Sequence, residues 1–300
     1  MRILIAGVNG NIGSELFSRL EMQVPTESIS YHESPIKKDF TKIDLTDVSK
    51  VEEFAKNCNI FDVLVFLVGL AHSKGKGKDL KKFKKVNSGT LINLLSALEE
   101  NNKRVKKIIF ASTIAVYGEK YQQKIYSEES VQEPSSPYAI SKLEAEKYLR
   151  DNYKSESWIL RLSPVYSSDI KLNIIRRTKI GHLFYRIGDG SKKLSLCNLE
   201  NIGIVVENIM YDKLPAGVYN LSDAKEYTYN QLLQSQQAKW ALYIPVFFIE
   251  IIYKLGKMFN NIFLKENSIK LITDNIFPST KIRSYIDIPF TIDDVQFDHC

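Results

Sequence analysis

The chain has 300 residues, of which 44% are hydrophobic and 25% are charged. This composition supports one or two compact domains with a large core and excludes a mainly disordered chain. The 41 Lys and Arg residues against 35 acids give a formal charge of +6, which is well short of a dedicated basic face, so we expect no nucleic-acid partner.

Positive charge is densest between Lys74 and Lys85, where seven lysines crowd together. We interpret this stretch as a solvated loop and helix face, because runs of like charge are usually solvated. A site for an anionic ligand or a membrane surface is the alternative.

The three cysteines, Cys58, Cys197 and Cys300, are odd in number and far apart. They form no disulfide framework and no metal-ligand spacing, which indicates a reducing compartment. The apolar run from Ile3 to Ala6 reaches glycine too soon for a signal peptide. We therefore expect a cytoplasmic protein without a bound metal.

The first half of the chain alternates between strand and helix patterns. Residues 3–6 form an apolar run of strand length, a glycine turn follows at 7–13, and helical spacing continues to residue 20. Further strands are expected at 28–31, 63–68, 107–112 and 157–162, and helices at 48–56, 83–99 and 138–152. Strands alternating with helices form a parallel sheet covered on both faces, so the pattern predicts an α/β, doubly wound fold over residues 1–165.

After Pro164 the alternation is less regular, and we assign residues 166–300 mainly to a smaller, substrate-binding region. Helices are expected at 201–211, 229–240 and 245–259, and a strand at 218–222. Residues 240–253 form the most apolar stretch, which is too short to span a membrane. A buried or subunit-contact helix is favoured there, and an interfacial helix followed by Lys254 and Lys257 is the alternative.

The glycine turn is the first candidate site. Gly7, Gly10 and Gly13 stand between a buried strand and a helix. Glycines at these places permit a tight turn, let the backbone approach a pyrophosphate, and allow the helix to pack closely on the strand. The helix N-terminus then offers free N–H groups and a positive dipole end to the phosphates. A glycine turn that binds nothing is the alternative.

A second candidate site combines a tyrosine, a lysine and a hydroxyl. Tyr138 and Lys142 are four residues apart and share one face of a helix that begins near Pro137. An ammonium beside a phenol favours the phenolate, which would lower the tyrosine pKa toward the range of a general acid and base. The strand 108–111 runs into Ser112 and Thr113, at the strand end where open α/β sheets bind ligands.

With these motifs in this order, the chain resembles the extended short-chain dehydrogenase/reductases, specifically the NAD-dependent epimerase/dehydratase branch that acts on nucleotide sugars. The resemblance covers most of the chain, and its matching segments are residues 7–13, 44–45, 68–72, 87–90, 111–118, 138–142, 160–166, 188–191 and 217–221. It implies a Rossmann domain that binds NAD or NADP.

The resemblance also implies roles for individual residues. Tyr138 would be the acid and base, Lys142 would hold the nicotinamide ribose, and Thr113 would be the hydroxyl partner, with Ser112 as the fallback. The cofactor would be bound by residues of the turn and of later strand ends, namely Gly7, Asn9, Gly10, Asn11, Ile12, Gly13, Asp44, Leu45, Ala71, Asn87 and Pro164.

The departures from the family pattern narrow the reaction. Related 4,6-dehydratases carry an acidic pair after the catalytic threonine, where this chain has Ile114 and Ala115, so dehydration is not expected. The family's later Arg-Asp-Phe segment is replaced by residues 194–196, and its aspartate pair by residues 200–201. Glu33 favours NAD, while Lys37 and Lys38 could serve the extra phosphate of NADP, so the cofactor stays open.

These observations predict an NAD(P)-dependent 4-epimerase or 4-keto reductase of a nucleotide-diphosphate hexose, in the synthesis of surface polysaccharide precursors. A dehydrogenase of a non-sugar carbonyl or alcohol shares the same catalytic residues and is the first alternative. A cofactor-sensing regulator on the same fold is the second. The expected partner is a nucleotide-sugar substrate, and a homodimer is compatible with the sequence.

Overall fold

The computed structural model describes residues 1–34, 39–70, 79–118 and 123–297. The chain divides into two compact units, each made of several segments. The first unit comprises Met1–Val116, Ser136–Arg161 and Val206–Val218, and the second comprises Tyr117–Ser135, Leu162–Val205 and Tyr219–Cys300. The functional division predicted at residue 165, into a cofactor domain and a substrate region, stays a prediction.

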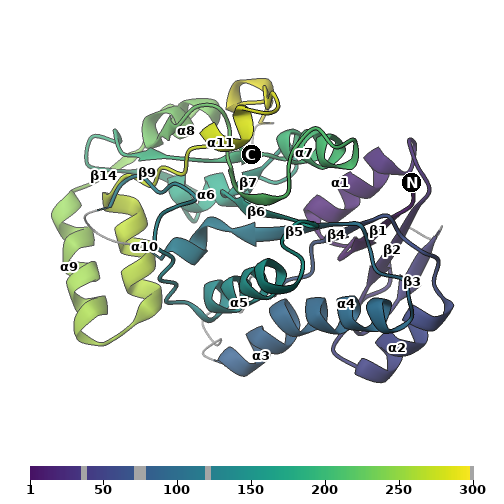
Figure 1. Ribbon diagram of the computed structural model, residues 1–300. Coiled ribbons are helices and arrows are strands. Elements are labelled where there is room, and N and C mark those ends of the chain that lie inside the picture. The colour runs from purple at the N-terminus through teal and green to yellow at the C-terminus, as the bar shows by residue number, and fades with distance from the viewer. Residues whose placement is uncertain (35–38, 71–78, 119–122, 298–300) are drawn as a thin grey trace. The chain divides into compact units, whose positions relative to one another are not determined.

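A seven-stranded sheet organises the first unit (Figure 1). Its order is β12 (Gly217–Leu221), β6 (Ser157–Leu162), β5 (Lys107–Thr113), β4 (Val63–Phe66), β1 (Ile3–Ala6), β2 (Thr26–Ser30) and β3 (Phe40–Lys42). β1 pairs in parallel with both β2 and β4, while β4–β5 and β2–β3 are also parallel. The strand order reverses between β1 and β4, which confirms the doubly wound parallel sheet.

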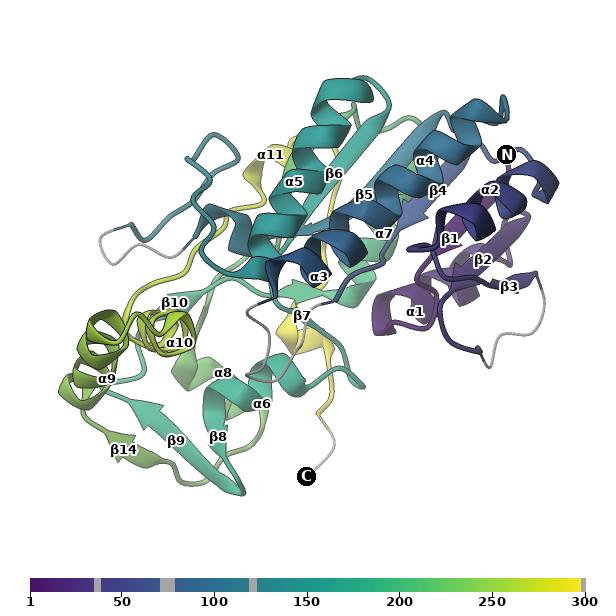
Figure 2. The same cartoon turned by 90° about the horizontal axis from the view of Figure 1, so that it is seen from below.

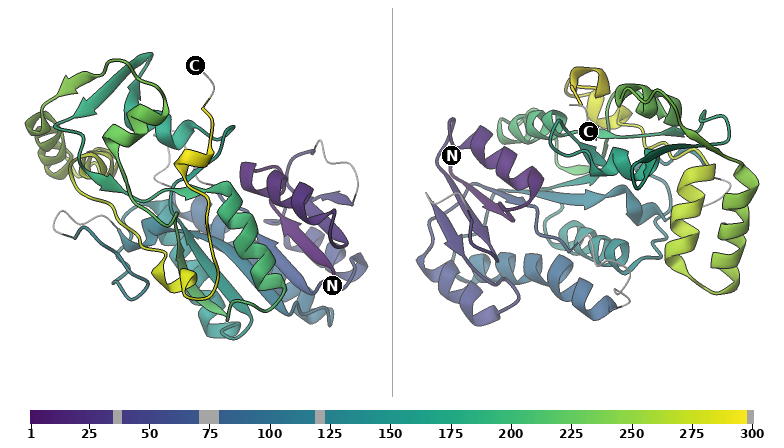
Figure 3. Two further views of the ribbon diagram at one scale, coloured as in Figure 1. Left: turned by 90° about the horizontal axis from the view of Figure 1, so that it is seen from above. Right: turned by 180° about the vertical axis from the view of Figure 1, so that it is seen from behind.

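Helices cover both faces of this sheet. On one face lie α2 (Val48–Asn57), α3 (Leu80–Lys84), α4 (Thr90–Glu100) and α5 (Pro137–Asn152), as Figure 2 shows. On the other face lie α1 (Asn11–Leu20) and α7 (Leu199–Met210), whose second half belongs to the first unit (Figure 3). Every residue of β1 and β4 is buried, because a parallel sheet covered on both faces has no solvent side.

The helix predicted at 83–99 is interrupted. α3 and α4 are joined by a π-helical turn, η1 (Lys85–Gly89). The hydroxyls of Ser88 and Thr90 donate to the carbonyls of Lys84 and Val86, one turn earlier. Such back-bonding competes with the helix ladder and bends a helix, and π-helical turns are frequent at functional sites. The turn places Asn87 in a fully buried position.

The second unit contains three small sheets, in the orders β10–β13, β11–β7 and β14–β9–β8. Its strands are β7 (Val165–Tyr166), β8 (Lys179–Ile180), β9 (Leu183–Ile187), β10 (Lys193–Leu194), β11 (Cys197–Asn198), β13 (Tyr227–Thr228) and β14 (Leu242–Ile244). Its helical elements are the first part of α7, α6 (Leu172–Thr178), α8 (Tyr229–Ser235), α9 (Val246–Met258), α10 (Ile262–Ile272), α11 (Thr280–Arg283) and η3 (Ile292–Asp294). The short helix η2 (Ile114–Tyr117) lies in the first unit except for its last residue.

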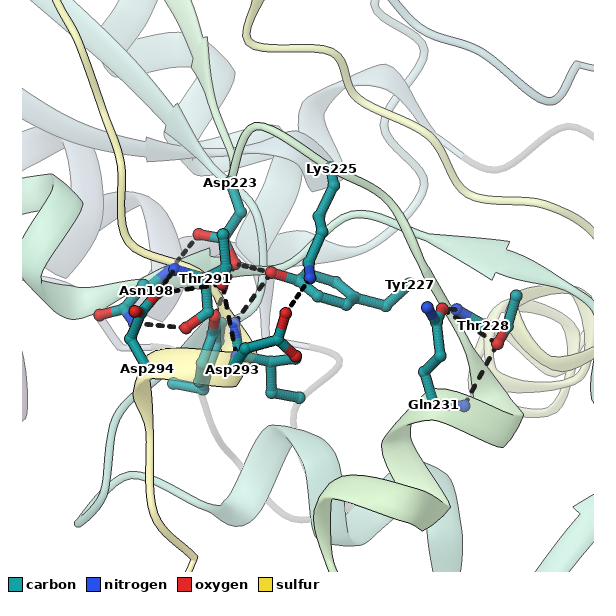
Figure 4. Close-up of polar contacts among 11 residues, drawn as sticks. Asn198, Asp223, Lys225, Tyr227, Thr228, Gln231, Thr291, Asp293 and Asp294 are labelled. Atoms are coloured by element: carbon teal, nitrogen blue, oxygen red, sulfur yellow. Dashed lines mark hydrogen bonds and ion pairs between the residues drawn. The ribbon is translucent and has the colours of Figure 1, made fainter.

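A buried carboxylate holds part of the second unit together (Figure 4). Asp223 accepts hydrogen bonds from the hydroxyls of Tyr166 and Tyr227, at 2.6 and 2.8 Å, and from the backbone N–H of Asn198 at 2.7 Å. The side-chain amide of Asn201 donates a further bond at 3.1 Å. Burial raises the pKa of Asp223 to about 6, and these donors oppose the rise.

The later sequence predictions were partly wrong. The helix expected at 229–240 ends at Ser235, and Gln237 has a φ of 53°, which an α-helix does not tolerate. α9 occupies nearly the range expected, and its exposure along much of its length rules out a helix buried within the chain, whereas a subunit-contact helix stays a prediction. Among the residues that the structure describes, no helix has the length and apolar character needed to cross a membrane.

Candidate active site

Tyr138 is positioned by the start of α5. The helix is capped by Ser136, whose hydroxyl accepts a hydrogen bond from the N–H of Ala139, and Pro137 occupies the first helical position. Both features are typical of helix N-termini, since they satisfy or remove backbone donors that have no partner within the helix. The half-buried Tyr138 therefore stands in the first turn, and Lys142 lies one turn later on the same face.

The structure brings Thr113 and Tyr138 together. Thr113 is the last residue of β5, at the carboxyl end of the strand, and its side chain lies close enough to the Tyr138 phenol to affect the pKa of that phenol. The Thr113 Oγ1 atom also accepts a hydrogen bond of 3.2 Å from the N–H of Ala115, which fixes its orientation. Burial raises the pKa of Tyr138, and the interaction with the Thr113 side chain opposes that rise.

Lys142 is held between two neighbouring strands. Its ammonium group donates to the carbonyls of Val68, at 3.2 Å, and Ala111, at 2.9 Å, and lies 4.7 Å from the centre of the Phe110 ring. Only 3% of Lys142 is exposed, and this burial lowers its pKa to about 7, although the charge of Glu146 acts in the opposite direction. The sequence predicted a tyrosine pKa lowered by Lys142, whereas burial gives the Tyr138 pKa a net rise.

Asn87 connects the tyrosine helix to the loop after β4. Its Oδ1 atom accepts a hydrogen bond of 2.6 Å from the N–H of Leu70, and its Nδ2 donates to the Ser141 hydroxyl at 2.9 Å. Ser141 in turn donates to the Tyr138 carbonyl at 2.8 Å. The Asn87 side chain thus contacts both the loop that follows β4 and the tyrosine helix.

Ser112 has a different environment from Thr113. It is buried, and its hydroxyl donates to the carboxylate of Glu146. The same carboxylate receives three hydrogen bonds from Arg161: from Nε to Oε1 and Oε2 at 3.1 and 3.2 Å, and from Nη2 to Oε2 at 2.7 Å. Glu146 and Arg161 are 0% and 1% exposed, so they form a buried ion pair behind the lysine. This arrangement favours Thr113 over Ser112 as the hydroxyl partner of Tyr138.

The glycine turn has the shape that a dinucleotide phosphate requires. Gly7 has a φ of 93°, which side-chain-bearing residues rarely adopt, and a Cβ atom on Gly13 would overlap the Gly7 carbonyl and lie 2.8 Å from the Cα of Val8. α1 starts directly after Gly10, and no side chain caps its first turn. The residues therefore fit the phosphates of a dinucleotide, which would approach the N–H groups of Asn11, Ile12 and Gly13.

The remaining cofactor residues lie in several places. Asn9 ties the turn to the segment after β2, since its amide donates to the carbonyls of His32 and Glu33 at 2.9 and 3.0 Å. Asp44 accepts a hydrogen bond of 2.9 Å from the N–H of Thr46. Burial raises the Asp44 pKa, but this bond and nearby lysines outweigh burial and lower it. Leu45 is buried directly after it.

Two predicted cofactor residues are not placed beside this group. Ala71 lies outside the described residues, as do Lys37 and Lys38, the candidates for binding the extra phosphate of NADP. Pro164 belongs to the second unit, where its carbonyl accepts a hydrogen bond of 3.1 Å from Cys197. Its place near the nicotinamide stays a prediction.

Sequence reasoning missed the Glu146–Arg161 pair and the contact of Gly69 with the lysine. A Cβ atom on Gly69 would lie 3.2 Å from the Lys142 ammonium nitrogen, so the backbone passes directly over that side chain. Glu146 follows Lys142 by four residues, a spacing that could have identified it as a neighbour on the same helix face. In the part of the chain that the structure describes, no cluster of three His, Cys, Asp or Glu side chains is arranged to hold a metal.

Comparison with known proteins decides the family. The sequence model of the NAD dependent epimerase/dehydratase family matches residues 3–202, which are two thirds of the chain. The matched range includes the glycine turn, Thr113, Tyr138 and Lys142. The chain belongs to this family. It is therefore an NAD(P)-dependent enzyme of the extended short-chain dehydrogenase/reductase type, as the motifs predicted.

Individual relatives of this epimerase/dehydratase family member are distant. The chain is 26% identical over 268 residues to the N-acetyl-alpha-D-glucosaminyl-diphospho-ditrans,octacis-undecaprenol 4-epimerase of Escherichia coli O157:H7, and the match covers 85% of this chain and 77% of the relative. It is 31% identical over 156 residues to the UDP-glucose 4-epimerase of Lacticaseibacillus casei, covering 50% and 46% of the two chains. The Thermus thermophilus UDP-glucose 4-epimerase, solved as a complex with NAD, shares the fold with a TM-score of 0.73 at 19% identity, covering 99% of this chain and 97% of that one.

Proposed function

We propose that the chain is a 4-epimerase of diphosphate-linked hexoses, with UDP-hexoses or UDP-N-acetylhexosamines as substrates, and that it serves the synthesis of surface polysaccharide precursors. The observation that carries the proposal is the proximity of Thr113 and Tyr138 at the carboxyl end of β5, with the buried Lys142 one helical turn after Tyr138. The relatives support epimerisation over net reduction, since both sequence relatives described above are 4-epimerases by name.

In the proposed reaction Tyr138 exchanges a proton with the C4 oxygen of the sugar. The bound nicotinamide supplies a reversible acceptor for the hydride from C4. Burial favours the neutral phenol of Tyr138, which suits a group that returns a proton to the C4 oxygen of a 4-keto sugar. Thr113 opposes the rise in the Tyr138 pKa. The positive charge of Lys142 would favour the phenolate, which is the form needed to take the proton from the C4 hydroxyl in the oxidation step.

The residues after Thr113 support epimerisation against dehydration. Ile114 and Ala115 belong to the short 3-10 helix η2, and neither side chain can exchange a proton. The N–H of Ala115 binds the Thr113 hydroxyl instead. A 4,6-dehydration needs a base for the C5 proton and an acid for the leaving hydroxyl, and these two positions supply neither.

A second substrate candidate has a specific observation behind it. The relative that matches 85% of this chain acts, by its name, on N-acetylglucosamine joined through diphosphate to undecaprenol. Both substrate types share a diphosphate on C1 of the hexose, and the proposed chemistry at C4 is identical for either. The experiment therefore compares substrates that differ in the group attached to the diphosphate, a nucleoside or a polyprenyl chain.

The test offers the purified enzyme UDP-glucose, UDP-N-acetylglucosamine and polyprenyl-diphospho-N-acetylglucosamine, with NAD present. Products are separated by chromatography and their C4 configuration is read by NMR. We expect a C4 epimer from at least one substrate without net change in NADH absorbance. Absence of any epimer, or net consumption of cofactor, would contradict the proposal.

The residue roles need matched variants. Tyr138→Phe should reduce turnover by about 10²–10⁴-fold while NAD binding is retained, because only the proton exchange is lost. Tyr148→Phe, on the same helix, removes a half-buried phenol outside the site and should retain activity. Equal activity of the Tyr138→Phe variant and the wild type would move the acid and base role to another residue.

A further inference from the structure

The exposed apolar side chains of the protein are concentrated in one segment. Among the described residues, 23 large apolar side chains are exposed, and 11 of them lie within residues 240–263. We call these eleven the α9 face: Trp240, Leu242, Tyr243, Phe247, Phe248, Ile251, Ile252, Leu255, Met258, Phe259 and Phe263. Single exposed apolar residues are normal on a protein surface, but a contiguous group of this kind marks an interaction site.

The α9 face is not the side by which the hairpin packs on itself. α9 and α10 lie side by side in Figures 1 and 2 and are in extensive contact. Their contact uses Gly256, where a Cβ atom would lie 2.9 Å from the Cβ of Leu264 and 2.9 Å from the N atom of Lys265. Ile249, seven residues earlier, packs in the small core that also contains Ile272. The buried residues of α9 thus form one stripe, and the exposed apolar residues lie on the rest of the helix.

The charges near the α9 face are mainly positive. Lys254 and Lys257 are exposed on α9 itself, and Lys239 directly precedes Trp240. Between residues 239 and 270 there are five lysines and two glutamates. Exposed aromatic and aliphatic side chains together with lysines are the composition of helices that lie in a membrane interface and attract anionic lipids. An uncharged apolar partner would offer no negative charge to these lysines, whereas an anionic membrane would.

The dimensions fit a helix that lies on a bilayer. α9 has 13 residues, which corresponds to about 20 Å at 1.5 Å per residue. The hydrocarbon core of a bilayer is about 30 Å thick, so α9 is too short to cross it. Trp240 and Tyr243 add rings with a polar edge, which favour the headgroup level of a membrane.

We propose that the α9 face docks on the surface of an anionic phospholipid membrane, with α9 lying in the plane of the interface. Phe247, Phe248, Ile251 and Ile252 enter the boundary between headgroups and acyl chains. Lys254 and Lys257 pair with lipid phosphates. The docking is a property of the folded chain and needs no substrate.

Vesicle binding tests the proposal. The full chain is sedimented with vesicles of equimolar phosphatidylglycerol and phosphatidylcholine, and separately with vesicles of phosphatidylcholine alone. We expect binding to the anionic vesicles that weakens with added salt, and at least about tenfold weaker binding to the neutral ones. Absence of binding to the anionic vesicles would overturn the proposal.

Tryptophan fluorescence locates the contact. The chain has two tryptophans, of which Trp240 is 62% exposed and Trp158 is 5% exposed. Anionic vesicles should shift the wild-type emission to shorter wavelength, and the Trp240→Phe variant should lose the shift. A shift that persists in this variant would place the contact elsewhere.

Variants separate a membrane from a second copy of the chain. The double variant Phe248→Ser, Ile252→Ser should lose vesicle binding at least about tenfold. Ile60→Ser and Val131→Ser, which remove more exposed apolar side chains outside the face, should bind as the wild type does. Light scattering gives the oligomeric mass of each protein. If the double variant changes the oligomeric mass and leaves vesicle binding intact, the α9 face is a contact between copies and the proposal is wrong.

Discussion

Replacement of Arg161 by methionine should strongly destabilise the fold, because it leaves the Glu146 carboxylate buried without its principal counter-charge. Glu146 and Arg161 are 0% and 1% exposed and are joined by a two-pronged contact, with bonds of 2.7 and 3.1 Å. Breaking such a pair by removing one partner typically costs about 3–5 kcal/mol. The Ser112 hydroxyl and the positive charge of Lys142 remain near Glu146, so we expect about 3 kcal/mol, the lower end of that range.

The assay is equilibrium unfolding in urea, followed by far-UV circular dichroism at neutral pH. Glu146→Met should destabilise by a similar amount, because it leaves a buried guanidinium. The double variant Glu146→Met, Arg161→Met should cost less than the sum of the two single variants, with a coupling of at least about 2 kcal/mol. Arg104→Met is the control, since Arg104 is 41% exposed and its ion pairs with Glu99 and Glu156 are screened, and it should cost less than about 1 kcal/mol.

Additive costs in the double variant would refute the reasoning, because they would mean that the two charges do not depend on each other. A loss of less than about 1 kcal/mol in the free energy of unfolding of Arg161→Met would also refute the reasoning, since a buried carboxylate without its counter-charge should destabilise the fold by more than that. The control must stay near the wild type for either conclusion.

Three further predictions concern the buried lysine, the glycine turn and the second unit. Lys142 has a folded pKa of about 7 against an ordinary value of 10.5, so the free energy of unfolding should rise with pH between these values, by up to about 1.4 kcal/mol per unit, and Lys142→Met should remove that slope in urea titrations at several pH values. Gly13→Ala should weaken NAD binding in calorimetry by at least about tenfold, because the added Cβ overlaps the backbone of the turn. Asp223→Asn should cost about 2–4 kcal/mol in urea unfolding, because the amide has only one acceptor oxygen and would turn an NH2 group toward buried donors, such as the hydroxyls of Tyr166 and Tyr227. Asp293→Asn, whose carboxylate is 72% exposed, should cost less than about 1 kcal/mol.

The parts of the site that sequence reasoning found share a local origin. Tyr138 and Lys142 lie one helical turn apart, so their spacing alone places them on the same face of a helix. The three glycines of the first turn stand within seven residues, so they are also close in space by their spacing alone. The prediction of Thr113 used one further rule, that parallel strands have their carboxyl ends at the same edge of the sheet. These rules need no knowledge of tertiary packing, which is why the sequence alone could propose these residues.

The parts that sequence reasoning missed depend on packing between distant segments. Arg161 meets Glu146 only because β6 and α5 belong to the same packed unit, and nothing in the strand pattern distinguishes a buried arginine from an exposed one. The tyrosine pKa was expected to fall because a lysine lies nearby in sequence. Its direction is set instead by burial, a property of the folded chain that no spacing reports.

The residues that depart from the family pattern pack or form hydrogen bonds within the second unit. Their packing limits which residues can bind the substrate. Leu194 and Leu196 lie in its core, where the family carries an Arg-Asp-Phe segment, and Asn201 donates to Asp223 and to the carbonyl of Phe290. Side chains committed to the core cannot also bind a substrate diphosphate, so recognition of that group must rest on other residues of this chain. A substrate that brings its own anchor, a polyprenyl chain in a membrane, would need fewer protein contacts to its diphosphate than a free nucleotide sugar does. An enzyme that docks through the α9 face and has lost the family's arginine should therefore turn over the polyprenyl-diphosphate sugar in anionic vesicles faster than UDP-N-acetylglucosamine in solution, and the opposite preference would separate the membrane contact from substrate choice.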